Sequence, residues 1–489
     1  MKRYLKKISA LFLAFAMIMG MCVTAGAADS TTVTITNKSD EAENAEYYYL
    51  QIIAPDTESS TGWKFTSEKI ATAVKSALGV TTDEEALKAL TDETSGATAM
   101  EKAIEAVAAI IDTSDMTESS ASIASDGTAT FTLSSAGLYY IKAVDKNSKV
   151  AYNPMAVYVG YTYDNTTGAA TLEPSASIEA KFTDIDVKKT NDVNGVAQIG
   201  STVTYTITST IPYISLAESD RKYYVTDTIT GAEYTVNSSN AITVTVEVDG
   251  VADSFTFSAT VTDTTVNGSA GQTFEVDLSK LLDDNKYAGQ EIKISYTATI
   301  TSVTAENTAN VYREPGGYYS SGSSTVTTGQ ITLTKTGESD EALEGAKFVI
   351  YRVENETKMY LVIDNGAYTW VALGTGQSLT NIGAETFKTG SDGTVTVTGL
   401  DTAYTYYFEE IEAPDGYSVN ETASEQSAWS TGVDSSGVYT ATASMKDTKL
   451  SSLPSTGGFG TYLFTIIGVV VMAVMASLYF IKRRRDSAE

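Results

Sequence analysis

The sequence contains no histidine and a single cysteine among its 489 residues. Without histidine, the chain has neither the Ser-His-Asp nor the Cys-His arrangement of nucleophilic hydrolases, and it has no histidine-based metal site. The one cysteine, Cys22, lies in an apolar N-terminal stretch, so no disulfide is available to stabilise the rest of the chain. We therefore expect no metal and no cofactor, and we expect some other means of stabilisation.

Tryptophan and basic residues are also scarce. There are three tryptophans, and 33 lysines and arginines stand against 61 aspartates and glutamates, which gives a formal net charge of −28. Such a charge argues against binding to nucleic acid or to an anionic membrane surface. A surface glycosidase needs only paired carboxylates. It remains a remote alternative, because acid pairs arise by chance in this composition and few tryptophans are present to line a sugar groove.

Residues 1–27 have the three parts of a secretory signal peptide. A basic start is followed by an apolar stretch from Ile8 to Val23, and the small residues Ala25, Gly26 and Ala27 form a cleavage site. Cleavage after Ala27 removes Cys22 with the signal peptide. The protein is therefore predicted to be secreted and free of cysteine.

The C-terminal residues 453–489 carry a second targeting pattern. About twenty nearly uncharged residues, 462–481, can span a bilayer as a helix, and the basic run 482–485 fixes the cytoplasmic side. A five-residue motif precedes this span: Leu453, Pro454, Ser455, Thr456 and Gly457. A plain membrane anchor after a turn would show the span and the basic run without needing the motif.

The order of motif, apolar span and basic tail resembles the LPxTG cell-wall sorting signal of Gram-positive surface proteins. The resemblance implies that a sortase cleaves between Thr456 and Gly457 and transfers the Thr456 acyl group to an amine. The apolar helix then serves as a transient membrane anchor, and the product is attached to peptidoglycan.

Between these ends the pattern is mainly β and is long enough for about three domains. Residues 28–183 are predicted to form an N-terminal domain of strands with a helical insertion, because helical periodicity appears at 67–78, 83–90 and 99–111. Residues 184–313 alternate apolar residues with Thr, Ser and Asp in short strands, which is typical of an antiparallel sandwich. A Gly, Ser and Tyr-rich linker at 314–329 precedes a strand-rich domain at 330–449.

The last domain contains a first-strand lysine, an acid in a longer motif and a last-strand acid. Period-two alternation places Lys335 on the same face as Ile331 and Leu333. Glu410 stands three residues before the sequence Ala-Pro-Asp-Gly-Tyr at 413–417. These segments resemble prealbumin-like (CnaB-type) domains. In that family the first-strand lysine and a last-strand Asn or Asp, here Asp447, form an intramolecular isopeptide bond assisted by the glutamate.

Burial is what this chemistry requires. An amine is nucleophilic only when it is neutral, and an apolar core lowers a lysine pKa and raises a carboxyl pKa. A protonated Glu410 can then act on the acceptor carbonyl as a proton shuttle. The alternative from spacing alone is that Lys335 extends to solvent and Glu410 lies on a charged strand edge.

The middle domain resembles isopeptide-forming β-sandwich domains of fimbrial subunits, in which Lys, Asp and Asn fill three roles. The resemblance and the alternation of inward residues assign Lys189, Asp227 and Asn307, with Asp227 as the assisting acid. A register slip of one residue exchanges the two faces of a strand, so Lys188 and Asn310 stay open as alternatives. Solvated polar residues at strand ends are the simpler interpretation of all five.

Backbone pilins carry a lysine near the junction of their first two domains that attacks the acyl-enzyme of the next subunit. Lys181 occupies this place, after Ala180 where proline is usual, and it is the predicted polymerising lysine. Lys142, Lys146 and Lys149 are weaker candidates, and an ordinary solvated lysine is the alternative for each.

The whole chain resembles the major subunit of a sortase-assembled Gram-positive pilus. The resemblance implies a structural protein rather than an enzyme, with tandem Ig-like or prealbumin-like β-sandwich domains. Its implied partners are a sortase, identical subunits in a covalent head-to-tail polymer, and peptidoglycan. Adhesion to host or neighbouring cells, through an extracellular-matrix or glycan ligand, is a further expectation. A monomeric wall-anchored adhesin is the main alternative.

Overall fold

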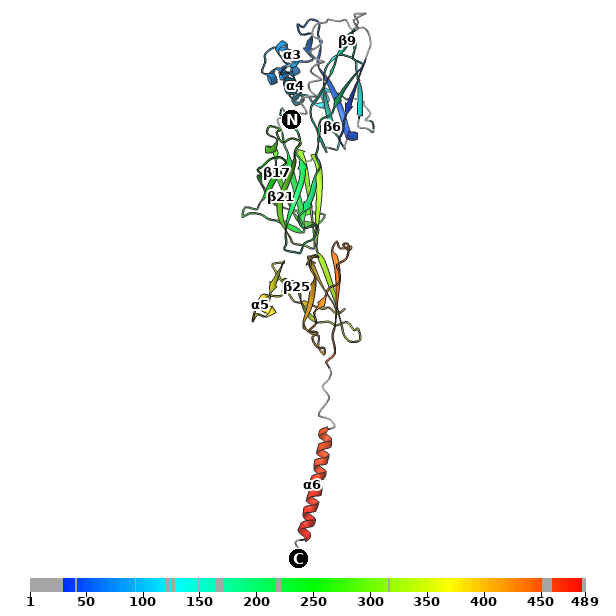
Figure 1. Cartoon of the computed structure of the whole chain (residues 1–489), viewed down its shortest axis with the longest axis vertical. Coiled ribbons are helices and arrows are strands. Elements are labelled where there is room, and N and C mark those ends of the chain that lie inside the picture. The colour runs from blue at the N-terminus through cyan, green and yellow to red at the C-terminus, as the bar shows by residue number, and fades with distance from the viewer. Residues whose placement is uncertain are drawn as a thin grey trace. The chain divides into compact units, whose positions relative to one another are not determined.

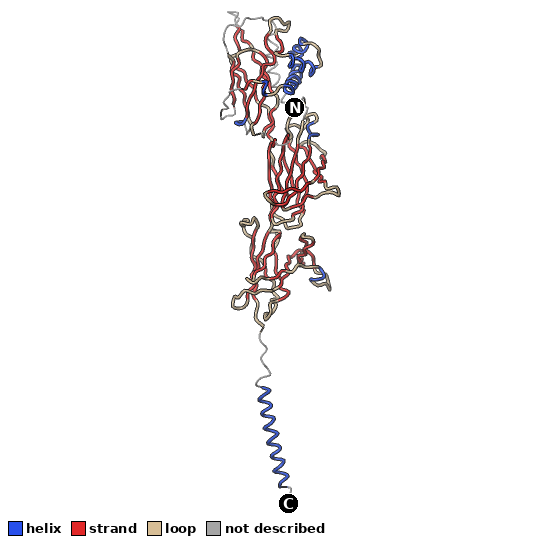
Figure 2. Tube along the Cα trace, turned by 180° about the vertical axis from the view of Figure 1, so that it is seen from behind, coloured by secondary structure: helices blue, strands red, loops and turns tan. Residues whose placement is uncertain are grey.

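The computed structural model describes residues 30–39, 42–92, 94–118, 124, 128–147, 149–163, 170–216, 221–314, 317–450 and 460–485. The predicted signal peptide, 1–27, and the motif from Leu453 to Gly457 lie outside the described residues. The chain divides into two compact units, Met1–Thr328 and Gly329–Glu489. Strands predominate in both units, which confirms the mainly β class (Figures 1 and 2).

The first part of unit 1 contains two main sheets, ordered β11-β1-β5 and β3-β2-β6-β8, with β4 paired to β2. Val33 and Ile35 point inward from β1 while their threonine neighbours point outward or lie at the rim. The strands are β1 (Thr31–Thr36), β2 (Ala45–Pro55), β3 (Trp63–Phe65), β4 (Thr117–Glu118), β5 (Thr128–Leu133), β6 (Gly137–Asp145), β7 (Val150–Tyr152), β8 (Met155–Val159), β9 (Tyr161–Tyr163), β10 (Ala170–Leu172), β11 (Ser175–Glu179) and β12 (Phe182–Asp184).

Three helices form the predicted insertion: α2 (Glu68–Leu78), α3 (Asp83–Thr91) and α4 (Gly96–Ile110). Ser67 caps α2, and Thr82 with Glu85 forms a capping box at the start of α3. Adjacent side chains of β6 face opposite sides of its sheet and belong to different apolar cores. Tyr140 packs with the helices, and Tyr139 packs toward β1. The sheet containing β2 and β6 is thus covered by helices on one face and by a second sheet on the other.

The second part of unit 1 is an antiparallel sandwich around one large apolar core. One sheet has the order β13-β14-β21-β17-β18, with β16 beside β21, and the other has the order β19-β20-β15-β22-β23. The strands are β13 (Lys188–Asn191), β14 (Thr202–Thr210), β15 (Tyr224–Thr230), β16 (Ala232–Tyr234), β17 (Ala241–Val248), β18 (Phe255–Thr260), β19 (Thr262–Val266), β20 (Ser269–Asp277), β21 (Glu291–Ile300), β22 (Thr304–Glu314) and β23 (Gly317–Thr327).

The predicted linker at 314–329 is wrong, because most of it is strand β23, which pairs with β22 along its length. Tyr319 and Val326 of β23 are buried in the core of the sandwich. Gly322 lies against the backbone of Val187, where an added Cβ would meet the Val187 carbonyl oxygen at 2.6 Å. Small residues here therefore permit close strand packing, whereas the sequence prediction took them as a sign of flexibility.

Unit 2 contains a three-stranded sheet, β29-β24-β32, and a larger sheet, β27-β26-β25-β30-β31 with β28 beside β25. Apolar residues of both sheets form its core. The elements are β24 (Gly329–Thr336), β25 (Lys347–Glu354), β26 (Thr357–Asp364), β27 (Ala367–Ala372), α5 (Leu379–Ile382), β28 (Phe387–Lys388), β29 (Thr394–Leu400), β30 (Tyr406–Glu412), β31 (Ser424–Glu425) and β32 (Tyr439–Lys446). The first strand β24 and the last strand β32 are parallel neighbours.

The C-terminal helix α6 (Gly460–Arg485) contains the predicted membrane span 462–481. The segment Tyr462–Arg484 has a mean hydropathy of 2.4 and is long and apolar enough to cross a bilayer. Its side chains are exposed along the helix, as expected of a segment whose apolar surface is covered by lipid instead of protein.

Candidate functional site

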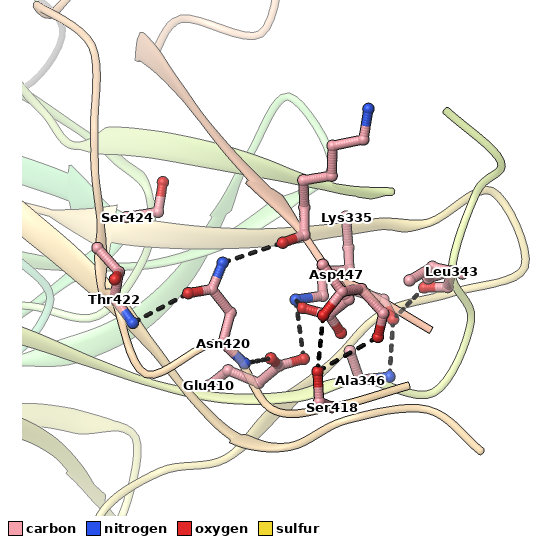
Figure 3. Close-up of polar contacts among 12 residues, drawn as sticks. Lys335, Leu343, Ala346, Glu410, Ser418, Asn420, Thr422, Ser424 and Asp447 are labelled. Atoms are coloured by element: carbon pink, nitrogen blue, oxygen red, sulfur yellow. Dashed lines mark hydrogen bonds and ion pairs between the residues drawn. The ribbon is translucent and has the colours of Figure 1, made fainter. Parts of the chain in front are cut away.

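Lys335 and Asp447 meet at one end of the smaller sheet of unit 2. Lys335 is the last inward-facing residue of β24, and Asp447 directly follows β32. The parallel register sets Lys335 opposite Met445, and the Asp447 backbone N–H donates to the Thr336 carbonyl at 2.9 Å. The Lys335 Nζ donates to Asp447 Oδ1 (Figure 3). The first and last strands of the domain therefore bring an amine and a carboxyl group into contact.

Glu410 reaches the same point from the opposing sheet. Alternation along β30 turns Tyr406, Phe408 and Glu410 inward. Glu410 Oε1 lies 2.9 Å from Lys335 Nζ in an ion-pair contact (Figure 3). The two sheets thus enclose one amine between two carboxyl groups, and the Phe348 ring centroid lies 5.5 Å from that amine.

The side chains of Lys335, Glu410 and Asp447 are each 0% exposed. Burial raises the pKa of Glu410 above its ordinary value of 4.5; the Asn420 N–H and Lys335 oppose this rise, and the Asp447 carboxylate adds to it. One cation with two acids is neutral when one acid keeps its proton, and the raised pKa of Glu410 favours its protonated form. Asp447 Oδ2 is buried without a hydrogen-bond partner among the described residues.

Asn420 holds Glu410 in place, a role that no pattern in the sequence indicates. The Asn420 backbone N–H donates to Glu410 Oε2 at 2.8 Å, and its Nδ2 donates to the Lys446 carbonyl at 2.9 Å (Figure 3). The loop after β30 is thereby tied to the last residue of β32. Because Oε2 accepts this N–H, Oε1 is the oxygen that faces Lys335 and is free to carry the proton. A loop asparagine ten residues beyond Glu410 has no periodicity that would reveal such a role.

The middle sandwich contains a second buried amine. Lys189, on β13, faces the core, and its Nζ donates to Asp227 Oδ2 on β15 of the opposite sheet. Both side chains are 0% exposed. Burial lowers the pKa of Lys189 and so favours the neutral amine, while the Asp227 carboxylate acts in the opposite direction.

Asn307 is connected to this pair through a tyrosine. Asn307, on β22, is 1% exposed, and its Nδ2 donates to the Tyr296 hydroxyl at 3.2 Å. The Lys189 Nζ donates to the same hydroxyl, and the Tyr234 hydroxyl donates to Asp227 Oδ1 at 2.7 Å. Asn307 Oδ1 is buried without a hydrogen-bond partner among the described residues. The sequence did not single out either tyrosine, because each looks like an ordinary core residue of an alternating strand.

The alternative register residues lie elsewhere. Lys188 is exposed on the outer face of β13, and Asn310 is only partly buried on β22. The structure thus turns Lys189 and Asn307 into the core and Lys188 and Asn310 away from it.

Lys181 lies in the short gap between β11 and β12 and is exposed. Its carbonyl accepts the Asn153 N–H at 2.9 Å, which fixes the backbone. Within the described part of the chain, its amine has no hydrogen-bond or ion-pair partner. By contrast, Lys146 pairs with Glu46 at 2.9 Å, and Lys142 is half-buried on β6.

Metal chemistry has no support in the described residues, where no group of three or more cysteines, aspartates or glutamates is arranged to hold an ion. The sorting motif itself, from Leu453 to Gly457, lies outside those residues, between Leu450 and α6.

Two segments of the chain match known protein families. Residues 329–447 match the SpaA prealbumin-like fold domain, and residues 446–487 match the LPXTG cell wall anchor motif. The C-terminal part of the chain is a prealbumin-like domain with an LPXTG anchor. Among curated protein sequences, none matches this chain.

Two solved structures are similar to most of the chain. The T6 backbone pilin of serotype M6 Streptococcus pyogenes aligns with a TM-score of 0.54 and 17% identity, covering 88% of this chain and 100% of that one. The full-length major pilin SpaD of Corynebacterium diphtheriae aligns with a TM-score of 0.47 and 15% identity, covering 88% and 100%. At these identities the first likeness shows a shared fold.

The domain, the anchor and the fold together identify the general class of this protein. It is a cell-wall-anchored surface protein that shares its fold with a Gram-positive backbone pilin, and its C-terminal helix fits a membrane anchor before sorting.

Proposed function

We propose that this protein is the backbone subunit of a sortase-polymerised pilus whose domains are braced by internal isopeptide bonds. A sortase cleaves the Thr456–Gly457 bond and transfers the Thr456 acyl group to Lys181 of the next subunit. Repetition builds a head-to-tail polymer, and the last subunit is transferred to peptidoglycan. Such a shaft would carry adhesion to host or neighbouring cells.

The buried contact between Lys335, Glu410 and Asp447 is the observation that carries this proposal. In a site without solvent, Lys335 first passes its ammonium proton to Asp447. The neutral amine then attacks Cγ of the Asp447 carboxylic acid, and an amide bond forms as the C–OH bond breaks. Glu410 supplies the proton that turns the departing oxygen into water, and it regains a proton from the attacking nitrogen. The overall reaction joins an amine and a carboxylic acid and releases one water molecule.

The middle domain supports the same chemistry with a different acceptor. Lys189 would attack Asn307 Cγ, and ammonia would leave. Because Lys189 also contacts Asp227 directly, condensation with Asp227 and loss of water is the competing outcome. Mass mapping of the cross-linked peptides separates the two.

Each bond would join the first strand of a domain to a late strand of the same domain. In unit 2 these strands are parallel neighbours, so a pull on the chain ends of the domain would reach the cross-link before the ladder between the strands could open. A covalent brace of this kind takes the place of the disulfides that the sequence lacks.

Polymerisation is tested on the cell surface. Cell-wall extracts of the bacterium that makes this protein, boiled in detergent, are expected to show a ladder of covalent multimers. Lys181→Arg is expected to reduce the ladder to wall-bound monomer, because arginine remains protonated and is no nucleophile. Lys149→Arg, on a neighbouring exposed lysine, should leave the ladder unchanged. Monomer alone in the unaltered strain would indicate a wall-anchored adhesin.

A further inference from the structure

The hydroxyl of Tyr296 touches all three residues of the middle-domain site. It accepts hydrogen bonds from Lys189 Nζ and from Asn307 Nδ2, and the Asp227 carboxylate, which accepts from the same Lys189 Nζ, is close enough to raise its pKa. Tyr296 lies on β21, and its ring stacks on Tyr205 with centroids 6.0 Å apart. Among the described residues, no other group joins the amine, the acid and the amide in this way.

This position matters because of the leaving group. When an amine attacks a carboxamide, the amide nitrogen must take up a proton before it can depart as ammonia. Asp227 is placed to remove the proton from Lys189, since the two are in direct contact. The described residues place no carboxyl group on Asn307 Nδ2, whose hydrogen bond goes to the Tyr296 hydroxyl.

We propose that Tyr296 is a catalytic residue of the middle-domain bond, relaying a proton from Asp227 to the departing nitrogen of Asn307. This rests on the proposed function. As Lys189 Nζ bonds to Asn307 Cγ, Asp227 takes the Nζ proton. Tyr296 gives its hydroxyl proton to Nδ2 and takes the proton held by Asp227. The Cγ–Nδ2 bond breaks with its electron pair on nitrogen, ammonia leaves, and Tyr296 and Asp227 return to their starting states.

The surroundings favour a relay over an ionised tyrosine. Burial and the Asp227 carboxylate hold the pKa of Tyr296 well above its ordinary value of 10.0. A phenolate is therefore disfavoured, so the hydroxyl must receive one proton as it gives up the other. The hydroxyl accepts hydrogen bonds from Lys189 Nζ and from Asn307 Nδ2, so it lies between the amine that loses a proton and the nitrogen that must gain one.

Two other buried tyrosines serve as matched controls. The Tyr205 hydroxyl has no hydrogen-bond partner among the described residues, although its ring lies 5.5 Å from Lys189 Nζ. Among the described residues, the Tyr234 hydroxyl hydrogen-bonds to Asp227 and to neither the amine nor the amide. Removing the hydroxyl of Tyr205 tests the loss of a buried oxygen alone, and removing that of Tyr234 tests a change at Asp227 alone.

The experiment follows bond formation in the full chain, made by cell-free synthesis in detergent and quenched in acid over time. The fraction of chains with Lys189 joined to Asn307 is read from digested peptides by mass spectrometry. Tyr296→Phe keeps the ring packing and is expected to slow the reaction by about 100-fold or more, the usual range for general acid–base catalysis. Tyr205→Phe should react like the unaltered chain, and Tyr234→Phe should fall between the two.

An unchanged rate in Tyr296→Phe would overturn the relay while leaving the bond itself intact. If the unaltered chain forms no Lys189 bond, or joins Lys189 to Asp227 with loss of water, the proposed acceptor is wrong and the relay falls with it. If Tyr296→Phe does not fold, 3-fluorotyrosine at this position keeps the shape and lowers the phenol pKa. A reaction rate that is insensitive to that change would also refute the relay.

Discussion

Replacing Glu410 with glutamine removes the proton shuttle of unit 2 and almost nothing else. Glutamine has nearly the same size, and its amide oxygen can still accept the Asn420 N–H that now binds Glu410 Oε2 at 2.8 Å. It also matches the charge of the protonated acid that the raised pKa of Glu410 favours. Lys335 and Asp447 remain as a buried ion pair in the variant. The difference between the two proteins is therefore mainly the covalent bond.

The loss of stability can be estimated from the length of the closed loop. Lys335 and Asp447 are 112 residues apart in the sequence. In the chain-entropy description, closing a loop of that length stabilises the folded state by about 4.8 kcal/mol. For a domain of this size, such a change corresponds to a decrease of roughly 20 °C in the unfolding temperature.

Two measurements on Glu410→Gln check this prediction. The intact mass should show the water retained, about 18 Da above that of a bonded chain after allowing for the substitution. Scanning calorimetry should show the transition of unit 2 at the lower temperature. Glu412→Gln is the control, because Glu412 lies on the same strand with its side chain 60% exposed and pairs with Lys347 at the surface. If Glu410→Gln still loses water, or if its transition shifts by only a few degrees, the shuttle role of Glu410 is refuted.

Three further predictions concern the same site. Asp447→Asn should give a bonded protein of the same mass and unfolding temperature as the unaltered one, because loss of ammonia from asparagine and loss of water from aspartate yield the same amide; a different final mass would contradict this. Asn420→Pro removes the N–H that orients Glu410 and should slow bond formation, while Asn420→Ala keeps that N–H and should be much less affected; equal rates would show that the hydrogen bond is not needed. Lys335→Met prevents the bond and leaves Glu410 with a raised folded-state pKa, so unit 2 should be most stable below pH 4.5 and should lose stability as the pH rises through that pKa; thermal unfolding against pH measures this, and a flat profile would contradict it.

The sequence was a good guide wherever the signal is local. Strict alternation of Val33 and Ile35 with threonine over 32–36 is typical of a strand, and both residues are 0% exposed in β1 (Thr31–Thr36). Helical periodicity located the insertion, whose first two helices begin at Ser67 and Thr82 caps. The same alternation predicted the inward face of Lys335, because one charged residue among apolar ones on a strand face must be buried with them.

The linker prediction failed because the same amino-acid composition is found in flexible linkers and in closely packed strands. Glycine, serine and threonine at 314–329 are typical of a flexible linker, yet they also form an edge strand that packs closely on Val187. Only the pairing of β23 with β22, a contact with another part of the chain, separates the two.

The polar residues that contact the reacting groups could not be predicted from the sequence, for a related reason. Tyr296 and Lys189 are 107 residues apart, and Tyr296 lies on an alternating strand among other core residues. Asn420 acts through its backbone N–H, which any residue except proline possesses. Such roles depend on how distant strands and loops meet, and no local pattern in the sequence records that.

The most direct test is the accurate mass of the segment from Ala28 to Ser452, which contains both proposed bonds. Two bonds, one formed with loss of ammonia and one with loss of water, predict a mass about 35 Da below that of the sequence. Peptide mapping should then join Lys189 to Asn307 and Lys335 to Asp447. A mass equal to that of the unmodified sequence would contradict the account, because the buried amines would then be ordinary ion pairs and the shaft would have no covalent brace.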